Sequence, residues 1–479
     1  MASLKKNIAL SYINTITGII FPLITFPYAT RVLMPQGIGT IDFLNSIVNY
    51  IVLLTSLGIP FYAVREIAKC RDDIYVRNKK TIEITILNLL LCIIGYFVVF
   101  ILGLFVPQIR QHADIFYILS LSIIFTAIGV QWFYQAIEDF EYITIRGIVI
   151  RVLCASGLFI FVKTKEDLIP YAFVLVGSTV GNNLLNFIHL RKFIPVTRRL
   201  VSHLHIMRHL KPSLKIFVMF AFVSIYVYLN SIILGFLDSE QAVGYYSAGV
   251  RIPHIVNTVV TSIGAVMLPR CSNLIETGKM AEFKKLITKS YHFIFGISLP
   301  LTIGLIMLAK PITLILCGTH FEASVAVVRI TAATILCVSL SDVIGMQILF
   351  PMNKENIVIA STCAAAISSV FFNFALIPFI SAKGAAVATL AAEFSIIFVE
   401  THWGKRYIPF KFFSKTTLNY IAASILMSAS IVPILAIHNL WIQLIAGFAV
   451  GATVYMGFLY YHKDELVMMC LEFINKKKQ

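Results

Sequence analysis

The stretch IIFPLITFPYATRVL, residues 19–33, places two prolines and an arginine in a long apolar run that begins near Ile8. Pro22 and Pro27 each remove a backbone donor and crowd the preceding turn of a helix. An unpaired backbone group in hydrocarbon costs several kcal/mol, so such breaks persist only where protein or water covers them. The stretch therefore predicts a bent membrane helix that lines a cavity, with Arg31 near its outer end.

The composition predicts a protein that crosses the membrane many times. The 479 residues are 58% hydrophobic and 13% charged, with a mean hydropathy of +0.86, which excludes a soluble globular protein of this length. Lys5 and Lys6 precede an apolar segment long enough to span, so we interpret it as a retained helix rather than a cleaved signal. The eight cysteines show no Cys-X-X-Cys spacing, and we expect no disulfide framework, no metal site and no cofactor.

Apolar segments of spanning length predict the fold class: an all-α polytopic membrane protein with about 14 transmembrane helices. Their expected limits are 8–31, 41–64, 82–106, 115–137, 147–162, 169–190, 214–236, 245–269, 291–309, 327–350, 357–379, 385–401, 417–437 and 441–461.

The distribution of basic residues predicts the orientation. With the N-terminus in the cytoplasm, 30 of the 39 Lys and Arg fall in cytoplasmic loops, 6 in outer loops and 3 at membrane depth. This bias predicts that both termini are cytoplasmic. It also explains the net charge of +16 by contact with anionic membrane lipids, without nucleic acid.

A weak internal echo indicates a duplication. RVLMPQGIGTIDF (31–43) and LGFLDSEQAVGYYSA (234–248) both read as a helix end, a short polar turn and a glycine that opens the next helix. A parallel repeat of a six-helix unit predicts two six-helix bundles around a central cavity, plus two further helices. The expected divisions are a bundle at 1–190, a basic cytoplasmic linker at 191–213, a second bundle at 214–403, and two extra helices with a basic tail at 404–479.

Five stretches spread along the chain are characteristic together: FPLITFPYATRVLMPQGIG (21–39), SLGIPFYAVREIAKCRDD (56–73), QWFYQAIEDFEYITIR (131–146), YYSAGVRIPHIVN (245–257) and LFPMNKEN (349–356). They resemble stretches of the bacterial polysaccharide transporters. These Wzx-type flippases of O-antigen and capsule repeat units belong to the multidrug/oligosaccharidyl-lipid/polysaccharide flippase superfamily.

The resemblance implies a flippase that moves an undecaprenyl-pyrophosphate-linked oligosaccharide from the cytoplasmic to the periplasmic leaflet by alternating access. It implies a place in the bacterial inner membrane, and cooperation with a polysaccharide polymerase and a chain-length regulator. In the related lipid II flippases, cavity arginines hold the pyrophosphate, and one of them matches Arg251. Their arginines in the first two helices have no counterpart within 8–30 or 41–64 of this chain.

Three arginines are the candidate pyrophosphate ligands: Arg251, Arg31 and Arg329. A guanidinium is always charged and binds phosphate oxygens in a bidentate manner. For each, the alternative is an arginine whose long side chain reaches the outer interface.

Acidic residues suggest two further roles. Asp342 and Glu393 lie deepest in the predicted spans and are candidates for coupling to an ion gradient, with a helix–helix hydrogen bond as the alternative. A candidate cytoplasmic gate consists of Arg65, Glu138, Asp139, Glu141, Arg146 and Arg151. We expect Arg151 to pair with one of these acids.

Three rival functions are weighed against the flippase. A multidrug or cation exporter of the same superfamily requires acids at depth, whereas basic groups outnumber them here. An enzyme acting on the same lipid usually carries a long outer loop with catalytic residues, and the predicted outer loops are short; we expect no enzymatic activity. A non-transporting scaffold of polysaccharide assembly is disfavoured by the charges at membrane depth.

Overall fold

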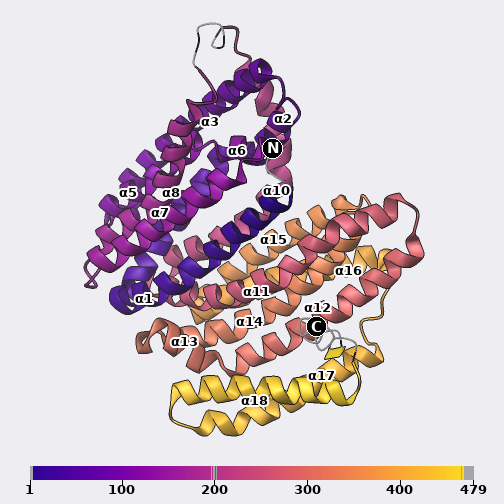
Figure 1. The fold of residues 1–479 in the computed structure, drawn as a ribbon. Coiled ribbons are helices and arrows are strands. Elements are labelled where there is room, and N and C mark those ends of the chain that lie inside the picture. Colours follow the sequence, from indigo (N-terminus) through magenta and orange to yellow (C-terminus); the bar gives the residue numbers. More distant parts are fainter. Residues whose placement is uncertain (1–3, 196, 198–199, 201, 465–466, 469–479) are drawn as a thin grey trace. The chain divides into compact units, whose positions relative to one another are not determined.

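The computed structural model describes residues 4–195, 197, 200, 202–464 and 467–468. Side chains are described within these ranges except at 4–5, 7–9, 218–226, 263 and 265–266. Most of the predicted basic tail lies outside the described residues. The chain forms two compact units, Met1–Gly244 and Tyr245–Gln479, called here the N-terminal and C-terminal units (Figure 1).

The N-terminal unit is built from helices, as the hydropathy pattern predicts. Its elements are α1 (Leu4–Ser56), α2 (Ile59–Ala68), α3 (Ile74–Phe105), α4 (Pro107–Arg110), α5 (Ala113–Ile128), α6 (Gln131–Ala136), α7 (Phe140–Phe161), α8 (Leu168–Leu190), the 3-10 helix η1 (Ile206–His209), α10 (Leu210–Leu237) and the first residues of α11 (Glu240–Glu276).

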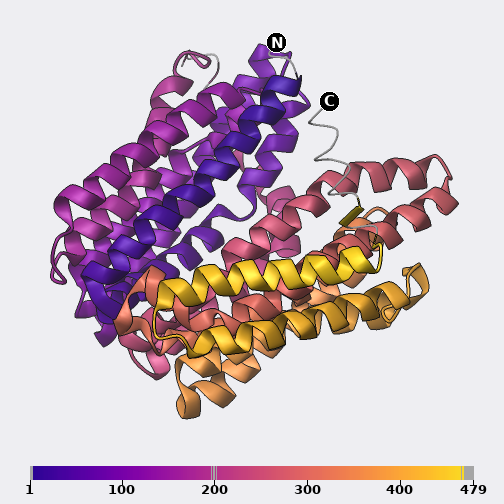
Figure 2. The ribbon, with the colours of Figure 1, turned by 60° about the horizontal axis from the view of Figure 1, so that its bottom comes forward.

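Helix α1 organises the N-terminal unit. It packs against α3, α5, α7 and α10, while α8 packs against α5 and α7. Figure 2 shows the dark N-terminal half of α1 beside the purple and magenta helices of this unit. The candidate residues of α1, α7 and α8 are therefore held next to one another.

The break in α1 does not fall at the prolines that suggested it. Pro22 and Pro27 lie inside the helix, and the non-helical backbone is at Met34, with φ 60° and ψ 173°, directly before Pro35. A bulky residue with positive φ is strained, and proline further restricts the residue before it. The expected spans 8–31 and 41–64 are thus two helical segments joined at a single residue.

The glycines of the internal echo contact each other's segments. A Cβ on Gly39 of α1 would lie 1.6 Å from the carbonyl oxygen of Glu240, and a Cβ on Gly244 of α11 would lie 2.0 Å from that of Pro35. Only residues without a side chain permit such an approach of two backbones. The two echoed turns therefore form one tight contact within the N-terminal unit.

The C-terminal unit contains the rest of α11 and two helical groups. Its further elements are α12 (Met280–Met307), α13 (Ala309–Cys317), the 3-10 helix η2 (Thr319–Phe321), α14 (Ser324–Ser341), the π-helix η3 (Asp342–Leu349), α15 (Glu355–Ile380), α16 (Ala382–Gly404), the 3-10 helix η4 (Lys405–Tyr407), α17 (Lys415–Ile431), the 3-10 helix η5 (Val432–Ala436) and α18 (Leu440–Tyr461).

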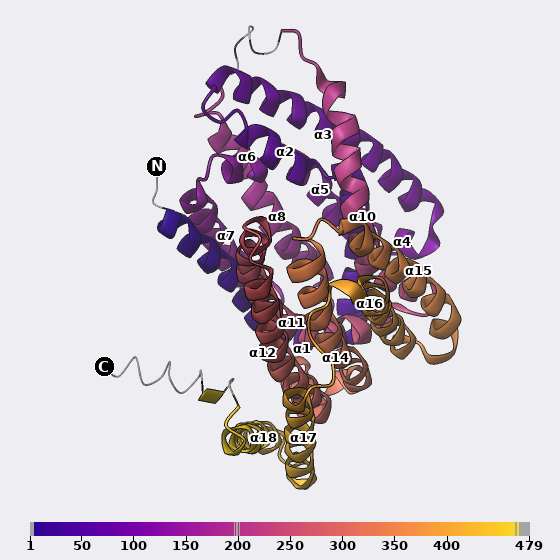
Figure 3. The ribbon, with the colours of Figure 1, turned by 90° about the vertical axis from the view of Figure 1, so that its right-hand side faces the viewer.

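Packing in the C-terminal unit places α14 at its centre. Helix α14 contacts α12 and α16, α16 pairs along its length with α15, and α17 joins α18 to α12. Figure 3 shows α15 beside α16, and the yellow pair α17 and α18. The π-helix that continues α14 is therefore surrounded by α12, α15 and α16.

The helical, membrane-spanning class is confirmed, but a count of 14 spans is not. Among the described residues, 12 helices are long and apolar enough to cross a membrane. One of these, Leu10–Ala68, covers both expected spans around the break in α1. The expected span at 214–236 corresponds to α10, of which Val227–Leu237 forms a shorter apolar helix. The predicted bundle limits, 1–190 and 214–403, stay a prediction. Helix α10, which opens the second predicted bundle, packs with α1 in the N-terminal unit.

We predict that Gly39→Ala destabilises the protein by about 1–3 kcal/mol, because the added methyl group overpacks the contact between α1 and α11. Gly304→Ala in α12 is the matched control, since no heavy atom lies within 4 Å of the added Cβ. The control should be neutral or gain about 0.5–1 kcal/mol. Thermal unfolding of both variants in detergent measures the difference, and equal melting temperatures would contradict the tight contact.

Candidate functional site

Two arginines of α7 lie inside the N-terminal unit and bind neutral acceptors. Arg146 is only 6% exposed, its Nε donates to Oδ1 of Asn182 at 3.1 Å, and its guanidinium lies 5.3 Å from the ring centre of Tyr142. Half-buried Arg151 donates through Nη1 to Oγ1 of Thr17 at 2.7 Å. Arg146 thus bonds to α8 and Arg151 to α1, and neither has a carboxylate partner among the described residues.

The neighbouring acids have other partners, which corrects the expected pairing of Arg151. Glu138 accepts from Nη1 of Arg71 at 2.8 Å, and Glu141 accepts from Nζ of Lys6 at 2.6 Å. Asp139 caps α7. Arg151 lies too far along α7 to reach them, because ten helical residues separate it from Glu141, roughly 15 Å of rise.

The gate itself stays a prediction. Arg65 is exposed at the end of α2 and lies 3.8 Å from Oε1 of Glu66, rather than next to an acid of the α6–α7 turn. The structure brings Glu138, Asp139 and Glu141 to the start of α7, with Arg146 one to two turns further on. The six gate residues are therefore distributed over two short regions of the N-terminal unit.

A buried carboxylate, Glu83 of α3, holds the segment that precedes α10. It is fully buried and accepts hydrogen bonds from the backbone of His205 at 2.8 Å and from the guanidinium of Arg208. Its Oε2 lies 2.9 Å from Nε2 of His209, whose Nδ1 lies 2.8 Å from the hydroxyl of Tyr62. Burial lowers the pKa of His209. This network, which the sequence pattern does not predict, ties the predicted linker to α2 and α3.

A second network lies at the tight contact of α1 and α11. Glu240, in the first turn of α11, accepts from Nε2 of Gln36 at 2.9 Å and from the hydroxyl of Thr40. Nε2 of His112, in the loop before α5, lies 3.1 Å from Glu240 Oε1. This carboxylate links three chain segments that the predicted topology places on the outer side.

The three candidate pyrophosphate ligands lie in different helices. Arg31 is exposed on α1, three residues before the break at Met34. Arg251 is half-buried on α11, and Arg329 is exposed on α14. Among these three arginines, only Arg251 is partly buried.

Two carboxylates of the C-terminal unit lie at the π-helix: Asp342 is its first residue, and Glu400 of α16 lies beside it. Asp342 accepts from Nε2 of Gln347 at 3.1 Å, and Gln347 in turn accepts from Oγ of Ser290 at 2.6 Å. Glu400 of α16 is 1% exposed, and its Oε1 lies 3.4 Å from Oγ of Ser361. π-helical turns occur frequently at functional sites. These carboxylates have neutral partners, so their charge is not balanced by a neighbouring cation in the interactions described.

Glu400, rather than the predicted Glu393, is the deeply buried acid of α16. Glu393 is half-buried on the same helix. Glu400 is not evident from the sequence, because it lies only five residues before Lys405 and resembles an interfacial acid. A Cβ on Gly345 would lie 2.7 Å from Glu400 Oε1, so the small glycine of the π-helix makes room for this carboxylate.

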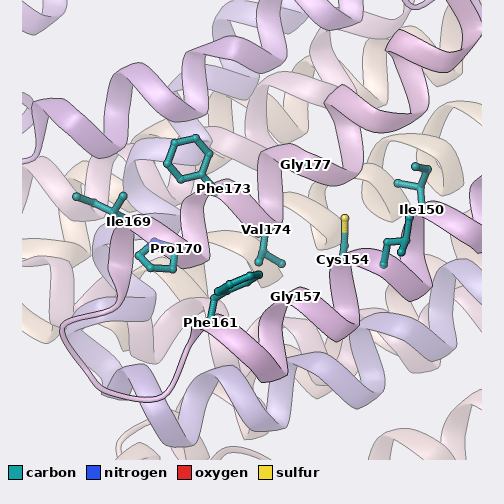
Figure 4. A pocket seen from close by; sticks show the side chains of 10 residues that line it. Ile150, Cys154, Gly157, Phe161, Ile169, Pro170, Phe173, Val174 and Gly177 are labelled. Atoms are coloured by element: carbon teal, nitrogen blue, oxygen red, sulfur yellow. The ribbon is translucent and has the colours of Figure 1, made fainter.

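An apolar pocket of about 660 Å³ lies between α7 and α8 (Figure 4). Phe161 projects from α7, and Phe173 and Val174 project from α8. Phe161 and Phe173 are 64% and 54% exposed, as expected for side chains that face lipid. The pocket has no charged lining residue and offers nothing to bind an anion.

These features define a class: a polytopic helical membrane protein of two compact units, with ionisable groups kept at membrane depth. Residues 4–275, more than half of the chain, match the family described as "Polysaccharide biosynthesis protein". The chain therefore belongs to this family.

Two relatives carry the name "Putative O-antigen transporter". The protein of Escherichia coli (strain K12) is 24% identical over 397 residues, which is 82% of this chain and 94% of the relative. That of Shigella dysenteriae is also 24% identical over 397 residues, covering 82% of this chain and 98% of the relative.

Solved structures share the fold. The lipid II flippase MurJ in an inward closed conformation matches with a TM-score of 0.72 at 17% identity. The match covers 95% of this chain and 99% of the MurJ chain. An inward-facing multidrug resistance transporter of the MATE family matches with a TM-score of 0.63 at 13% identity. The match covers 81% of this chain and 94% of the transporter chain. The family match confirms the expected resemblance to polysaccharide transporters, and these structures confirm the expected fold.

The pair His112–Glu240 predicts a pH dependence. The hydrogen bond to the Glu240 carboxylate raises the pKa of His112 above its ordinary value of about 6.5. Its stabilising contribution is therefore complete below about pH 6.5 and is lost as the pH rises through the raised pKa. The melting temperature of the wild type should fall over this range by more than that of His112→Asn. Parallel pH profiles of the two proteins would contradict the ion pair.

Proposed function

We propose that this protein is a flippase for a lipid-linked oligosaccharide. It carries the repeat unit of an O-antigen or capsule polysaccharide, linked to undecaprenyl pyrophosphate, from the cytoplasmic to the periplasmic leaflet of the bacterial inner membrane. Both termini are cytoplasmic in this proposal, and a polymerase and a chain-length regulator act on the translocated unit.

The family match over residues 4–275 is the observation that carries the proposal. The O-antigen transporter names of the relatives supply the class of cargo, and the shared fold of MurJ supplies a frame in which a lipid-linked cargo is moved. No catalytic role is required of any residue, and we propose a transporter rather than an enzyme.

Alternating access requires an element with two arrangements, and we propose that α1 is this element. Its break at Met34 stores backbone strain, which persists only where the surroundings impose it. The surroundings that hold Met34 in this conformation are the start of α11 and the hydrogen bonds of Glu240. We propose that this contact separates when the carrier opens on the outer side, and that the strain at Met34 is then released.

The pyrophosphate is proposed to bind Arg251, with Arg31 and Arg329 as further ligands. Partial burial of Arg251 supports this choice, because a guanidinium that is shielded from water binds phosphate oxygens more strongly. The exposed Arg31 and Arg329 retain the alternative of reaching the outer interface.

Ion coupling is proposed at Asp342, with Glu393 as a second candidate. The bond from Gln347 holds Asp342 in the first turn of the π-helix, and Glu400 lies beside the same helix. Carboxylates at membrane depth are typical of proton and cation pathways. A proton or cation taken up here would neutralise a charge that has no cationic partner in the interactions described.

Flipping can be measured with a fluorescent polyprenyl-pyrophosphate oligosaccharide in proteoliposomes. We predict that Arg251→Ala slows protein-dependent flipping at least tenfold. The variant loses a charge-assisted hydrogen bond to phosphate, and such a bond contributes about 1.5–3 kcal/mol. Lys383→Ala, which removes an exposed charge of α16, is the matched control and should keep the wild-type rate. Equal rates of the two variants would remove Arg251 from the site, and a wild type without flipping would refute the proposed function.

We predict that Asp342→Asn abolishes the acceleration of flipping by an imposed proton or sodium gradient, while flipping without a gradient continues. The amide keeps the shape of the side chain but cannot take up a cation or proton. Glu322→Gln is the control, because this exposed acid pairs with Lys310 at 3.2 Å on the surface. A gradient response that survives in Asp342→Asn would exclude this residue from coupling.

A further inference from the structure

A small polar cavity inside the N-terminal unit has no role in the proposal so far. It has a volume of about 230 Å³ and lies where α1, α7 and α8 meet the start of α6. Its lining is almost entirely amide, hydroxyl and guanidinium groups, from Asn14, Gln131, Ile143, Arg146, Gly147, Arg151, Ser178, Thr179, Asn182 and Asn183. Two of these residues are cations, and none is an acid.

The charge of the cavity is not neutralised by the protein. Arg146 is 6% exposed, and its buried Nη1 has no hydrogen-bond partner among the described residues. Arg151 is held by the hydroxyl of Thr17 and the backbone carbonyl of Asn14, at 2.7 Å and 3.3 Å. Of the acids closest in sequence, Glu138 pairs with Arg71, Glu141 pairs with Lys6, and Asp139 accepts from the backbone of Tyr142 as the cap of α7.

Such an arrangement is costly without a ligand. Leaving a buried guanidinium nitrogen unpaired costs free energy, and charges at membrane depth usually pair or face a pathway. The guanidinium of Arg151 lies close to the backbone of α1 and of its own helix. A Cβ built on Gly18 would lie 3.6 Å from its Nη2, and one on Gly147 would lie 3.8 Å from its Nη1, both ordinary van der Waals contacts.

We propose that this cavity is an anion-binding site for a phosphate-type group, and specifically a diphosphate. Two guanidiniums with amide and hydroxyl neighbours match the several oxygens and the charge of a diphosphate. Pockets that enclose a whole drug-sized ligand measure about 300–1,000 Å³, so this smaller cavity suits a charged group and not an entire oligosaccharide.

The position on the helix assigns the site to the cytoplasmic half of the membrane in the predicted topology. Arg146 and Arg151 lie six and eleven residues from the first residue of α7, Phe140, which is roughly 9 and 16 Å of helix rise. If the protein is the proposed flippase, the cavity receives the pyrophosphate of the cargo from the cytoplasmic leaflet first, and Arg251 binds it afterwards. This part of the inference rests on the proposed function.

Binding to the purified full-length protein in nanodiscs of zwitterionic lipid tests the site. Calorimetric titrations use inorganic pyrophosphate, farnesyl diphosphate and farnesol at matched ionic strength. Both diphosphates should bind the wild type, and farnesol should not. Arg146→Gln and Arg151→Gln should each weaken diphosphate binding about tenfold to a hundredfold, as expected for a charge-assisted hydrogen bond. Tighter binding of farnesyl diphosphate than of pyrophosphate, with the same loss in both variants, would identify the lipid-linked group as the ligand of the site.

Three further variants distinguish binding from folding. Arg191→Gln removes an exposed arginine after α8 and should bind like the wild type. Arg146→Lys keeps the charge but loses the planar fork, and should bind with intermediate affinity. Ser178→Val keeps both arginines and fills part of the cavity, so it should also weaken binding.

Diphosphate binding that is unchanged in Arg146→Gln and Arg151→Gln, or absent from the wild type, would overturn the inference. Equal binding of farnesol and farnesyl diphosphate would overturn it as well. These outcomes are independent of the flipping assay. A wild type that binds pyrophosphate through Arg146 and Arg151 but does not flip the glycan would preserve the site and refute the proposed function.

Discussion

The need to satisfy every backbone hydrogen bond in hydrocarbon determines the rest of this structure. It explains why the membrane-spanning segments are helical, and why Pro22 and Pro27 are accommodated within α1. The real break, at Met34, occurs where the start of α11 approaches through Gly39 and Gly244. A non-helical residue is thus placed where another backbone covers it. The same contact brings Glu240 within reach of Gln36, Thr40 and His112, so a polar network forms at the break.

A second constraint is the cost of a charge at membrane depth, and the two units meet it in opposite ways. In the N-terminal unit, Arg146 and Arg151 are cations held by neutral oxygens. In the C-terminal unit, Asp342 and Glu400 are acids held by an amide and a hydroxyl. Neither arrangement is neutral by itself if these groups are ionised. The first unit thus has the chemistry to bind an anion, and the second has the chemistry to bind a proton or cation.

Much of the fold could be predicted, because hydropathy and the basic loops report directly on insertion into the membrane. The echoed glycines Gly39 and Gly244 were also visible in the sequence, although their mutual contact was not. The networks of Glu83 and Glu240 were missed because their partners lie more than 100 residues away along the chain. The expected acidic partner of Arg151 was wrong for a different reason. The expectation relied on closeness in sequence, whereas contact on a helix depends on the distance along its axis and on the face that a side chain occupies.

The partners of the α7 arginines have a consequence for transport. An acid built into the cavity would stabilise the empty protein, but an incoming phosphate would then have to displace it. Neutral acceptors such as Asn182 and Thr17 orient the guanidiniums without competing for their charge. The empty cavity is therefore less stable than one that contains an acid. An anion that binds there regains this lost stabilisation as part of its free energy of binding. The lack of an acid among the residues that line the cavity does not help release, so the proposed mechanism needs a second cation that competes for the pyrophosphate. Arg251, which is half-buried, is the proposed second site.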